Sequence, residues 1–256
     1  MANDLAPVVL VHGVGLDHSM WDAMNQHVRV LLPERRVIVY DMLGHGDQPC
    51  KRGPFVLADF VTQLHSLLDH HEVSECDLAG FSMGAMVAQG FASAKPTRVR
   101  RLALLNSVYD RSESERSAVL ARVVDVRSGG YDASIETALQ RWFTPSFAAS
   151  RPDAVHQVRR RLLHNDVGAY ANAYQVFATA DRELVALATS IACPTLVATG
   201  SDDKRSTPEM TQRLAVAVPN GRAVVIDGAR HLMPIELPET VARLLTAFFS
   251  DEDAQL

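Results

Sequence analysis

The clearest chemical signal in the chain is the pentapeptide Gly80-Phe81-Ser82-Met83-Gly84, which follows an apolar run and opens a helical pattern. This G-x-S-x-G spacing predicts that Ser82 lies on a sharp strand-to-helix turn, because the two glycines allow close backbone packing around it. Its hydroxyl would then be exposed beside the positive end of a helix. Such a pentapeptide also occurs by chance in structural turns, but the strand before it and the helix after it favour a nucleophile.

A serine hydroxyl attacks a carbonyl efficiently only when a neighbouring base accepts its proton, so a histidine must be found among the 10 in the chain. We predict that His231 is this general base, because it follows the last strand-like run and precedes the C-terminal helix. It is then third in the chain order of serine, acid and histidine. The alternative for His231 is a loop histidine bonded to the backbone. Five others are interpreted as surface or structural residues: His65, His70, His71, His156 and His164.

The acid that orients the histidine is expected after the penultimate strand-like run, where two adjacent aspartates, Asp202 and Asp203, compete. We favour Asp203, since loops of this type usually present the later residue to the histidine, whereas Asp202 would cap the turn. Asp110, after the fourth run, stays open as a third option. The role of the acid is to hold the imidazole in one tautomer and to stabilise the imidazolium.

A tetrahedral intermediate also needs donors for its oxyanion, and two backbone N–H groups are predicted to serve. One belongs to Met83, directly after the nucleophile, and the other to Val14, in the turn that follows the first strand-like run. Each donor of this kind typically contributes about 10²–10³-fold to turnover. His12, in the same turn, is interpreted as a partner of loop backbone rather than a group in the chemistry.

Strand-like runs and longer helical patterns alternate along the chain, which is typical of a mostly parallel sheet with helices on both faces. Short continuous apolar runs are expected where both faces of a sheet are buried. Clear helical patterns cover residues 57–68, 83–94 and 241–249. The six predicted strands are Pro7–Val11, Val37–Tyr40, Cys76–Ala79, Leu102–Leu105, Thr195–Ala198 and Ala223–Ile226.

Residues 109–191 break this alternation, because they hold several helical patterns and no convincing strand. An insertion of this kind, between one strand and the next, predicts a helical cap over the carboxyl edge of the sheet, where open α/β sheets bind ligands. We therefore expect a core of residues 1–108 and 192–256 and a cap of residues 109–191. The helical patterns in the cap cover residues 117–126, 134–143, 154–163 and 169–178.

The composition suits a single α/β domain with an insertion, since 47% of the 256 residues are hydrophobic and 21% are charged. A net charge of −5 argues against a nucleic-acid or anionic-membrane surface, because both require a basic face. No apolar stretch approaches the roughly 18 residues of a membrane span, and residues 1–4 lack the basic start of a signal peptide. Cys50, Cys76 and Cys193 form no C-x-x-C pair and are expected to be free thiols in the cytoplasm. The oligomeric state stays open.

Several short motifs together resemble the α/β-hydrolase superfamily along nearly the whole chain. They are His12-Gly13, residues 41–46 (Asp-Met-Leu-Gly-His-Gly), the Ser82 pentapeptide, residues 200–203 and His231. Within this superfamily the chain is similar to the 3-oxoadipate enol-lactonase group, through residues 141–147 and 170–181. The resemblance implies an α/β-hydrolase fold and hydrolysis of a small enol-lactone. Only about six residues precede the first predicted strand, so the antiparallel hairpin that usually opens this fold is expected to be short or absent, leaving about six strands.

The resulting prediction is a serine hydrolase, of the carboxylic ester hydrolase or lactonase type, that forms an acyl-enzyme. Ser82 attacks the carbonyl, His231 accepts its proton and returns it to the leaving group, and water then hydrolyses the acyl-enzyme. The expected partner is a small-molecule ester or lactone. This mechanism requires no metal and no organic cofactor.

Specificity is expected to come from the cap, where aromatic side chains are candidates to line an apolar pocket. The same helical spacing also suits residues packed inside the cap. The run of three arginines at residues 159–161 favours a solvated face, but Arg141 and Arg160 are also candidates to bind a substrate carboxylate. The aromatic candidates are Trp142, Phe143, Tyr170, Tyr174 and Phe177.

Other functions stay open on this scaffold. A general carboxylesterase for small neutral esters, or a C–C bond hydrolase of the meta-cleavage type, would use the same residues. A lyase or a ligand-binding member of the fold is a further alternative, against which the complete set of catalytic candidates argues. Dehalogenases and epoxide hydrolases are disfavoured, because both normally place an aspartate where Ser82 stands.

Overall fold

The computed structural model describes residues 5–48 and 53–250, so Cys50 and the segment from Met1 to Asp4 lie outside the described part of the chain. Six strands form one sheet in the order β2-β1-β3-β4-β5-β6, and every neighbouring pair is parallel. The six predicted strands are confirmed, and no strand precedes β1 among the described residues. The strands are β1 (Val8–Val11), β2 (Val37–Tyr40), β3 (Cys76–Phe81), β4 (Val99–Leu105), β5 (Thr195–Gly200) and β6 (Gly221–Ile226).

The central strands are apolar because both of their faces are covered. β1, β3 and β5 are buried at every position. β2 and β6 lie at the two edges of the sheet, and they contain half-buried residues, in β6 alternating with exposed ones. The expectation that all six runs are buried on both faces is therefore wrong for the edge strands.

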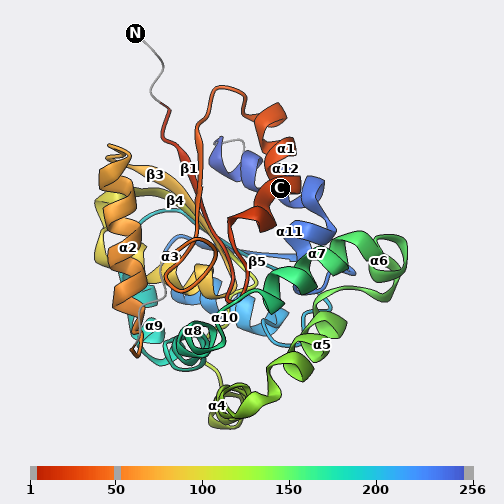
Figure 1. Cartoon of the computed structure of the whole chain (residues 1–256). Coiled ribbons are helices and arrows are strands. Elements are labelled where there is room, and N and C mark those ends of the chain that lie inside the picture. Colours follow the sequence, from red (N-terminus) through yellow and green to blue (C-terminus); the bar gives the residue numbers. More distant parts are fainter. Residues whose placement is uncertain (1–4, 49–52, 251–256) are drawn as a thin grey trace.

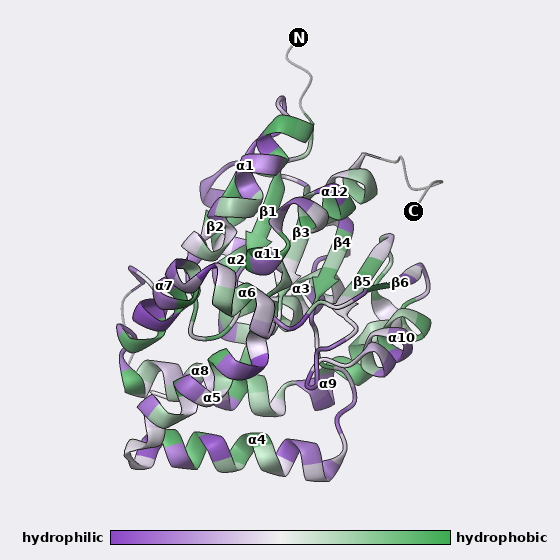
Figure 2. Cartoon of the chain, turned by 90° about the vertical axis from the view of Figure 1, so that its right-hand side faces the viewer, coloured by the Kyte–Doolittle hydropathy of each residue, from purple (hydrophilic) through white to green (hydrophobic). Residues whose placement is uncertain are grey.

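Helices cover both faces of the sheet (Figure 1). α1 and α12 pack against each other on one face, and α2 packs against α3 on the other. In Figure 2 the strands are largely green, whereas the helices show bands of green and purple, as expected when each helix turns one apolar side to the core. The core helices are α1 (Asp22–Leu31), α2 (Leu57–His70), α3 (Met83–Ala94), α10 (Pro208–Ala217), α11 (Met233–Glu236) and α12 (Pro238–Phe249).

Between β4 and β5 the chain is helical and contains no strand over residues 109–191, all of which the structure describes. We call this stretch the α4–α9 segment; it lies at the carboxyl ends of the strands (Figures 1 and 2). Four of its helices overlap the predicted patterns, while α6 and α9 are too short for periodicity to reveal them. The helices are α4 (Glu113–Asp125), α5 (Tyr131–Trp142), α6 (Pro145–Ser150), α7 (Pro152–Leu163), α8 (Val167–Thr179) and α9 (Asp181–Leu187).

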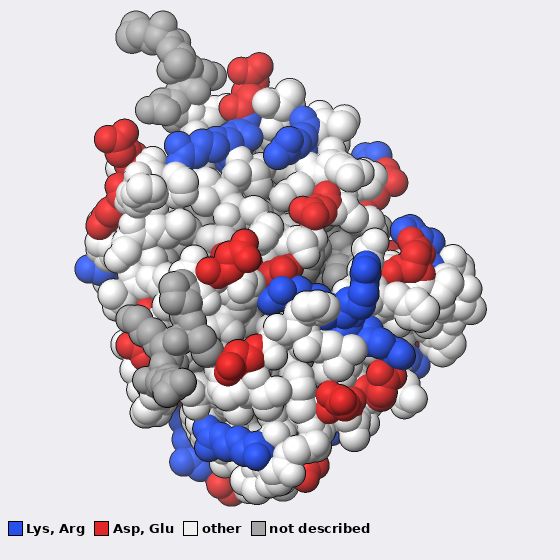
Figure 3. Space-filling view, viewed as in Figure 1, with Lys and Arg blue, Asp and Glu red and all other residues white. Residues whose placement is uncertain are grey.

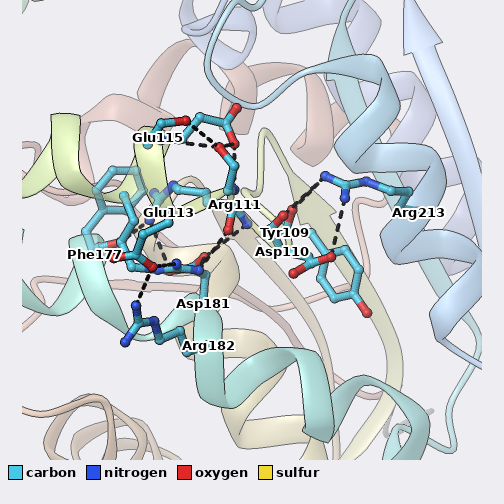
Figure 4. A network of polar contacts seen from close by, with 12 residues as sticks. Tyr109, Asp110, Arg111, Glu113, Glu115, Phe177, Asp181, Arg182 and Arg213 are labelled. Atoms are coloured by element: carbon cyan, nitrogen blue, oxygen red, sulfur yellow. Dashed lines mark hydrogen bonds and ion pairs between the residues drawn. The ribbon is translucent and has the colours of Figure 1, made fainter.

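A buried ion-pair network joins α4 to α9 near the point where the chain leaves β4 (Figure 4). Asp181 is 1% exposed and pairs with Arg111 at 3.3 Å and with Arg116 at 3.0 Å. Arg111 also donates to the carbonyl oxygen of Phe177 at 2.8 Å and lies over its ring, 4.4 Å from the ring centre. The network therefore holds the end of α8 against the start of α4.

The two cysteines in the described part of the chain, Cys76 and Cys193, are free thiols, the first buried and the second half-buried. Burial raises the pKa of Cys76 to about 12, so this thiol is inert rather than nucleophilic. No helix within residues 5–48 and 53–250 has both the length and the apolar character needed to cross a membrane.

Candidate active site

Ser82 lies on a tight turn between β3 and α3. Its φ of 54° is in the left-handed region, which side-chain-bearing residues rarely occupy. The turn leaves no room for side chains beside it: a Cβ on Gly80 would lie 2.2 Å from the carbonyl oxygen of Gly84, and a Cβ on Gly84 would lie 2.3 Å from that of Val11. Packing thus requires glycine on both sides of the serine, as the spacing predicted.

His231 lies between Ser82 and Asp203. Its Nδ1 is 2.6 Å from Asp203 Oδ2, and its Nε2 is 3.3 Å from Ser82 Oγ. With the proton of Nδ1 donated to the carboxylate, Nε2 is left as the acceptor for the serine hydroxyl. Asp203 comes from the loop after β5 and His231 from the loop after β6, so the three residues meet at the carboxyl edge of the sheet.

Asp203 is held as a carboxylate by four donors. Its Oδ1 accepts the backbone N–H groups of Arg205 at 2.9 Å and Ser206 at 3.0 Å, and its Oδ2 accepts from the side-chain amide of Asn106 at 2.9 Å in addition to His231. Burial alone raises the pKa of Asp203, but the charge of His231 and these hydrogen bonds outweigh burial and lower the pKa below its usual value.

The other two acid candidates lie elsewhere. Asp202 is exposed and does not cap its turn through a side-chain bond to backbone; Asp203 does so instead, and this corrects the expected division of roles. Asp110 is exposed and pairs with Arg213 at 3.4 Å, as Figure 4 shows, so it faces α10 rather than His231.

Asn106 is a site residue that the sequence analysis did not identify. It is fully buried, directly follows β4 and has a φ of 48°. Its amide nitrogen donates to Asp203 and, at 3.3 Å, to the hydroxyl of Thr199. A signal was present, because a polar residue at the carboxyl end of a fully apolar strand lies at the edge where such sheets bind ligands.

The two predicted oxyanion donors lie at the same edge. Met83 begins α3 directly after Ser82, and Val14 lines the pocket into which Ser82 opens. Neither N–H has a hydrogen-bond acceptor in the described part of the chain. Both groups are therefore available to an oxygen atom bound beside the serine.

The turn that carries Val14 rests on two buried histidines. His12 Nδ1 lies 2.8 Å from the carbonyl oxygen of Gly13, and its Nε2 accepts from the Met42 N–H at 2.9 Å, so His12 bonds loop backbone as expected. Its ring meets that of His45 edge to face at 5.2 Å. Burial lowers the pKa of His12 to about 4 and that of His45 to about 3, which keeps both rings neutral.

Ser82 and His231 open into a pocket between the sheet edge and the α4–α9 segment. The pocket contains about 690 Å³ of space outside protein atoms, part of it open to solvent. The ring of Trp142 is stacked on His231, with centroids 5.9 Å apart and planes at 30°. Four predicted aromatic residues line the pocket: Trp142, Tyr170, Tyr174 and Phe177.

The prediction that Phe143 lines this pocket is wrong. Phe143 is 2% exposed and stacks on Phe147, with centroids 5.2 Å apart, at the end of α5. Phe143 follows the last residue of α5 with an extended backbone, and its ring packs on Phe147 instead of facing the cavity. Trp142 faces the pocket, and Phe143 is packed inside the α4–α9 segment.

The two arginine candidates for binding a substrate carboxylate lie in different clefts. Arg141 lines the pocket, whereas Arg160 lines a different cleft beside α1 and α7, so its assignment to a carboxylate at Ser82 is wrong. Arg159 pairs with Glu136 at 2.7 Å on the surface. The pocket contains three further basic residues that the sequence analysis did not identify: Arg122, Lys204 and Arg205.

Asp17, His18 and Asp41 form the one group in the described residues whose ligand atoms lie close enough, within 4.8 Å, to share a metal ion. Their oxygens already hold loops: Asp41 accepts the N–H groups of His18 at 2.8 Å and Asp47 at 3.1 Å, and Asp17 caps the turn at Ser19. Asp17 also pairs with Arg161 at 3.1 Å. These contacts account for the cluster without a cation.

Comparison with known proteins agrees with this geometry. A model of the alpha/beta hydrolase family matches residues 8–244. The (E)-2-((N-methylformamido)methylene)succinate hydrolase of Acinetobacter baylyi is 35% identical over 94% of this chain and 89% of its own length. The 3-oxoadipate enol-lactonase 2 of the same organism is 28% identical over 92% of this chain and 85% of its own. The crystal structure of the enol-lactonase from Burkholderia xenovorans LB400 has a TM-score of 0.86 and 28% identity, covering 96% of this chain and 92% of its own.

Proposed function

Because the chain belongs to the alpha/beta hydrolase family, we propose that this hydrolase cleaves a small ester or lactone by attack of Ser82 on the carbonyl carbon. The observation that carries the proposal is the line of contacts from Ser82 Oγ through His231 to Asp203. Residues 109–191 would act as a cap that closes the pocket over the substrate.

In the first step, Ser82 Oγ bonds to the carbonyl carbon while His231 Nε2 takes the hydroxyl proton. The carbonyl electrons move to the oxygen, which the N–H groups of Val14 and Met83 stabilise. Asp203 keeps the proton on Nδ1 and stabilises the imidazolium. The carbon–oxygen bond to the leaving alcohol or enol then breaks, and His231 returns the proton to that oxygen.

Water completes the cycle by the same route. His231 takes a proton from water, the hydroxide bonds to the acyl carbon, and collapse of the second intermediate releases the acid and restores Ser82. For a lactone, alcohol and acid remain joined in one product.

A second candidate function is hydrolysis of an amide. It is favoured by the relative at 35% identity, whose name describes a succinate that carries an N-methylformamido group. The formamide carbonyl of such a compound can undergo the same attack by Ser82, with the nitrogen as leaving group. The enol-lactonase relative, at 28% identity, favours the lactone.

The test is turnover of 4-nitrophenyl acetate, butyrate and octanoate, 3-oxoadipate enol-lactone, and (E)-2-((N-methylformamido)methylene)succinate by wild type. Ser82→Ala is expected to reduce kcat/KM by about 10⁴-fold or more, because only the oxyanion donors and binding then remain. Ser93→Ala is the matched control, since Ser93 lies on the exposed end of the same helix and bonds Ser190.

The pattern of preferred substrates decides between the candidates. Highest kcat/KM on the lactone supports the first function, and highest kcat/KM on the formamide supports the second. A folded wild type that turns over none of the five compounds and does not react with a fluorophosphonate would contradict both.

A further inference from the structure

The pocket at Ser82 contains an excess of positive charge. Four cationic side chains line it, Arg122, Arg141, Lys204 and Arg205, against a single carboxylate, Asp203. Asp203 is already engaged by His231 and three other donors. The excess is local, because the whole chain has a net charge of −5, and acidic and basic side chains are interspersed over the face shown in Figure 3.

None of these four cations has a carboxylate within ion-pair distance in the described part of the chain. The Nε of Arg141 is buried and has no hydrogen-bond partner there. Most arginines elsewhere in the α4–α9 segment pair with an acid, as Arg116 does with Asp181 and Arg159 does with Glu136. Arg127 and Arg160 have no carboxylate partner in the described residues either, so what distinguishes the pocket is that four such cations face one space.

The cations also act on one another. Burial, together with the charges of Arg122 and Arg205, lowers the pKa of Arg141. Burial and the charge of Arg122 likewise lower the pKa of Arg205. Glu115, which lines the adjoining cavity with Arg122 and Arg205, accepts the backbone N–H of Ser112 on its Oε2 at 2.7 Å. Arg122 and Arg141 are half-buried, whereas Lys204 and Arg205 are exposed, and an anion bound in the pocket would offset the mutual repulsion of these like charges.

The four cations fall into two pairs. Arg122 and Arg205 also line a smaller cavity with Glu115, whereas Arg141 and Lys204 also line an outer cleft with Asp202. The pocket at Ser82 adjoins both spaces, since it shares two of these basic side chains with each. A ligand with one carboxylate can meet one pair at a time and leaves the other pair unbalanced.

We propose that this pocket binds a substrate with two carboxylates, one held by Arg122 and Arg205 and the other by Arg141 and Lys204. The scissile carbonyl then lies between them, beside Ser82. Guanidinium groups suit this role because their planar donors bind a carboxylate through two parallel hydrogen bonds. The inference deepens the proposed function, since it names the substrate class for the same serine, and it rests on that function.

The direct test measures binding rather than turnover, by calorimetric titration of butyrate, succinate, glutarate and adipate onto wild type and onto Ser82→Ala. The tightest diacid is expected to have a Kd at least about tenfold below that of butyrate in both proteins, since a second charge-assisted contact contributes that much or more. The advantage is expected to shrink as salt rises from 20 to 200 mM (about 20 to 7 Å of screening length). Equal Kd values for butyrate and every diacid would overturn the proposal.

Variants locate the two carboxylate subsites. Arg122→Gln and Arg141→Gln are each expected to raise the Kd of the preferred diacid at least about tenfold and to change that of butyrate less, because each removes one of two anion contacts. Arg160→Gln, which makes the same charge change in the other cleft, is the matched control and should leave the diacid Kd unchanged. If Arg160→Gln weakens diacid binding as much as the pocket variants do, the effect is one of overall charge and the proposal fails.

Failure of this inference and failure of the proposed function give different results. Tight diacid binding by an enzyme that does not hydrolyse any ester and does not react with a fluorophosphonate supports the subsites and contradicts the hydrolase mechanism. Rapid ester hydrolysis with no preference for diacids contradicts the subsites and leaves the mechanism intact. Thermal unfolding of each variant verifies that the compared proteins are folded.

Discussion

The sheet edge and the α4–α9 segment meet at one pocket, but they differ in whether the polar side chains that face it have partners within the chain. At the edge, both nitrogens of His231 and both oxygens of Asp203 have partners within the chain. On the segment, Arg122 and Arg141 face the same space with no carboxylate partner in the described residues. Deeper in the segment the arginines have carboxylate partners, since Asp181 pairs with Arg111 and Arg116.

This contrast separates two tasks that the pocket has to perform. Groups that move protons must be held in one geometry before substrate arrives, so they are bonded to the protein. Groups that recognise a ligand must leave their hydrogen-bonding capacity free for it. In the proposed mechanism the sheet edge sets the reaction, and the segment above it, together with Lys204 and Arg205 of the loop after β5, sets which molecule reacts.

The largest effect is expected from a substitution of Asp203, the acid that contacts His231. Asp203→Asn should lower kcat by about 10³–10⁴-fold on neutral and anionic substrates alike, because an amide donor favours the wrong imidazole tautomer. Asp202→Asn is the matched control one residue away, on an exposed side chain, and should change kcat by less than about twofold. A small loss in Asp203→Asn, or an equal loss in both variants, would show that the acid lies elsewhere.

The second prediction tests whether the ion pairs of Asp181 inside the α4–α9 segment stabilise the fold. Asp181→Asn leaves the buried Arg111 without a counter-charge and Arg116 with only the exposed Glu113, so the free energy of unfolding is expected to fall by about 3–5 kcal/mol. Urea denaturation measures this loss, and Glu183→Gln, an exposed acid on the same helix, is the control. A change below about 1 kcal/mol would mean that the network contributes little to stability.

The third effect concerns the histidines beneath the oxyanion turn. Their folded-state pKa values, about 4 for His12 and about 3 for His45, lie below the ordinary 6.5, so below pH 6.5 the unfolded chain takes up protons that the folded chain does not. Stability is therefore complete above pH 6.5 and falls as the pH falls, by about 2 kcal/mol for each histidine at pH 5.

Denaturation curves at pH 7, 6 and 5 measure this dependence. His45→Gln should flatten the loss between pH 7 and 5, and His27→Gln, at a half-buried position of α1, serves as the control for the substitution itself. Equal stability of wild type at pH 7 and pH 5 would contradict neutral buried histidines in this turn.

The sheet edge could be predicted from the sequence much further than the segment could. Ser82, Asp203 and His231 each follow a strand-like run, and the parallel order of the strands brings the ends of those runs together whatever the details of packing. The tight turn at Ser82 could also be predicted, because contacts within the turn and with β1 require glycine at Gly80 and Gly84.

The segment resisted prediction because its helices can be rotated without changing their local pattern. Periodicity placed Trp142 and Phe143 on one helix, but only packing against α6 decides which of the two rings faces the pocket. Arg122 was missed for a related reason, because an arginine on an amphipathic helix normally belongs to the solvated face. Its lack of a partner becomes visible only when β5 and its loop are placed beside it.

The smallest effect tests Asn106, which we assign as a positioning residue because it acts on Asp203 rather than on substrate. Asn106→Leu keeps the number and branching of the side-chain heavy atoms and removes the amide donor, so one of the four contacts that hold the carboxylate is lost. We expect kcat for 4-nitrophenyl butyrate to fall about tenfold with KM unchanged, since the position of Asp203 against His231 is disturbed and the pocket is not. Asn220→Leu, on the exposed turn before β6, should change neither constant. A rise in KM with unchanged kcat would instead mean that Asn106 shapes the pocket, and the division between a bonded sheet edge and a recognising segment would not hold at this residue.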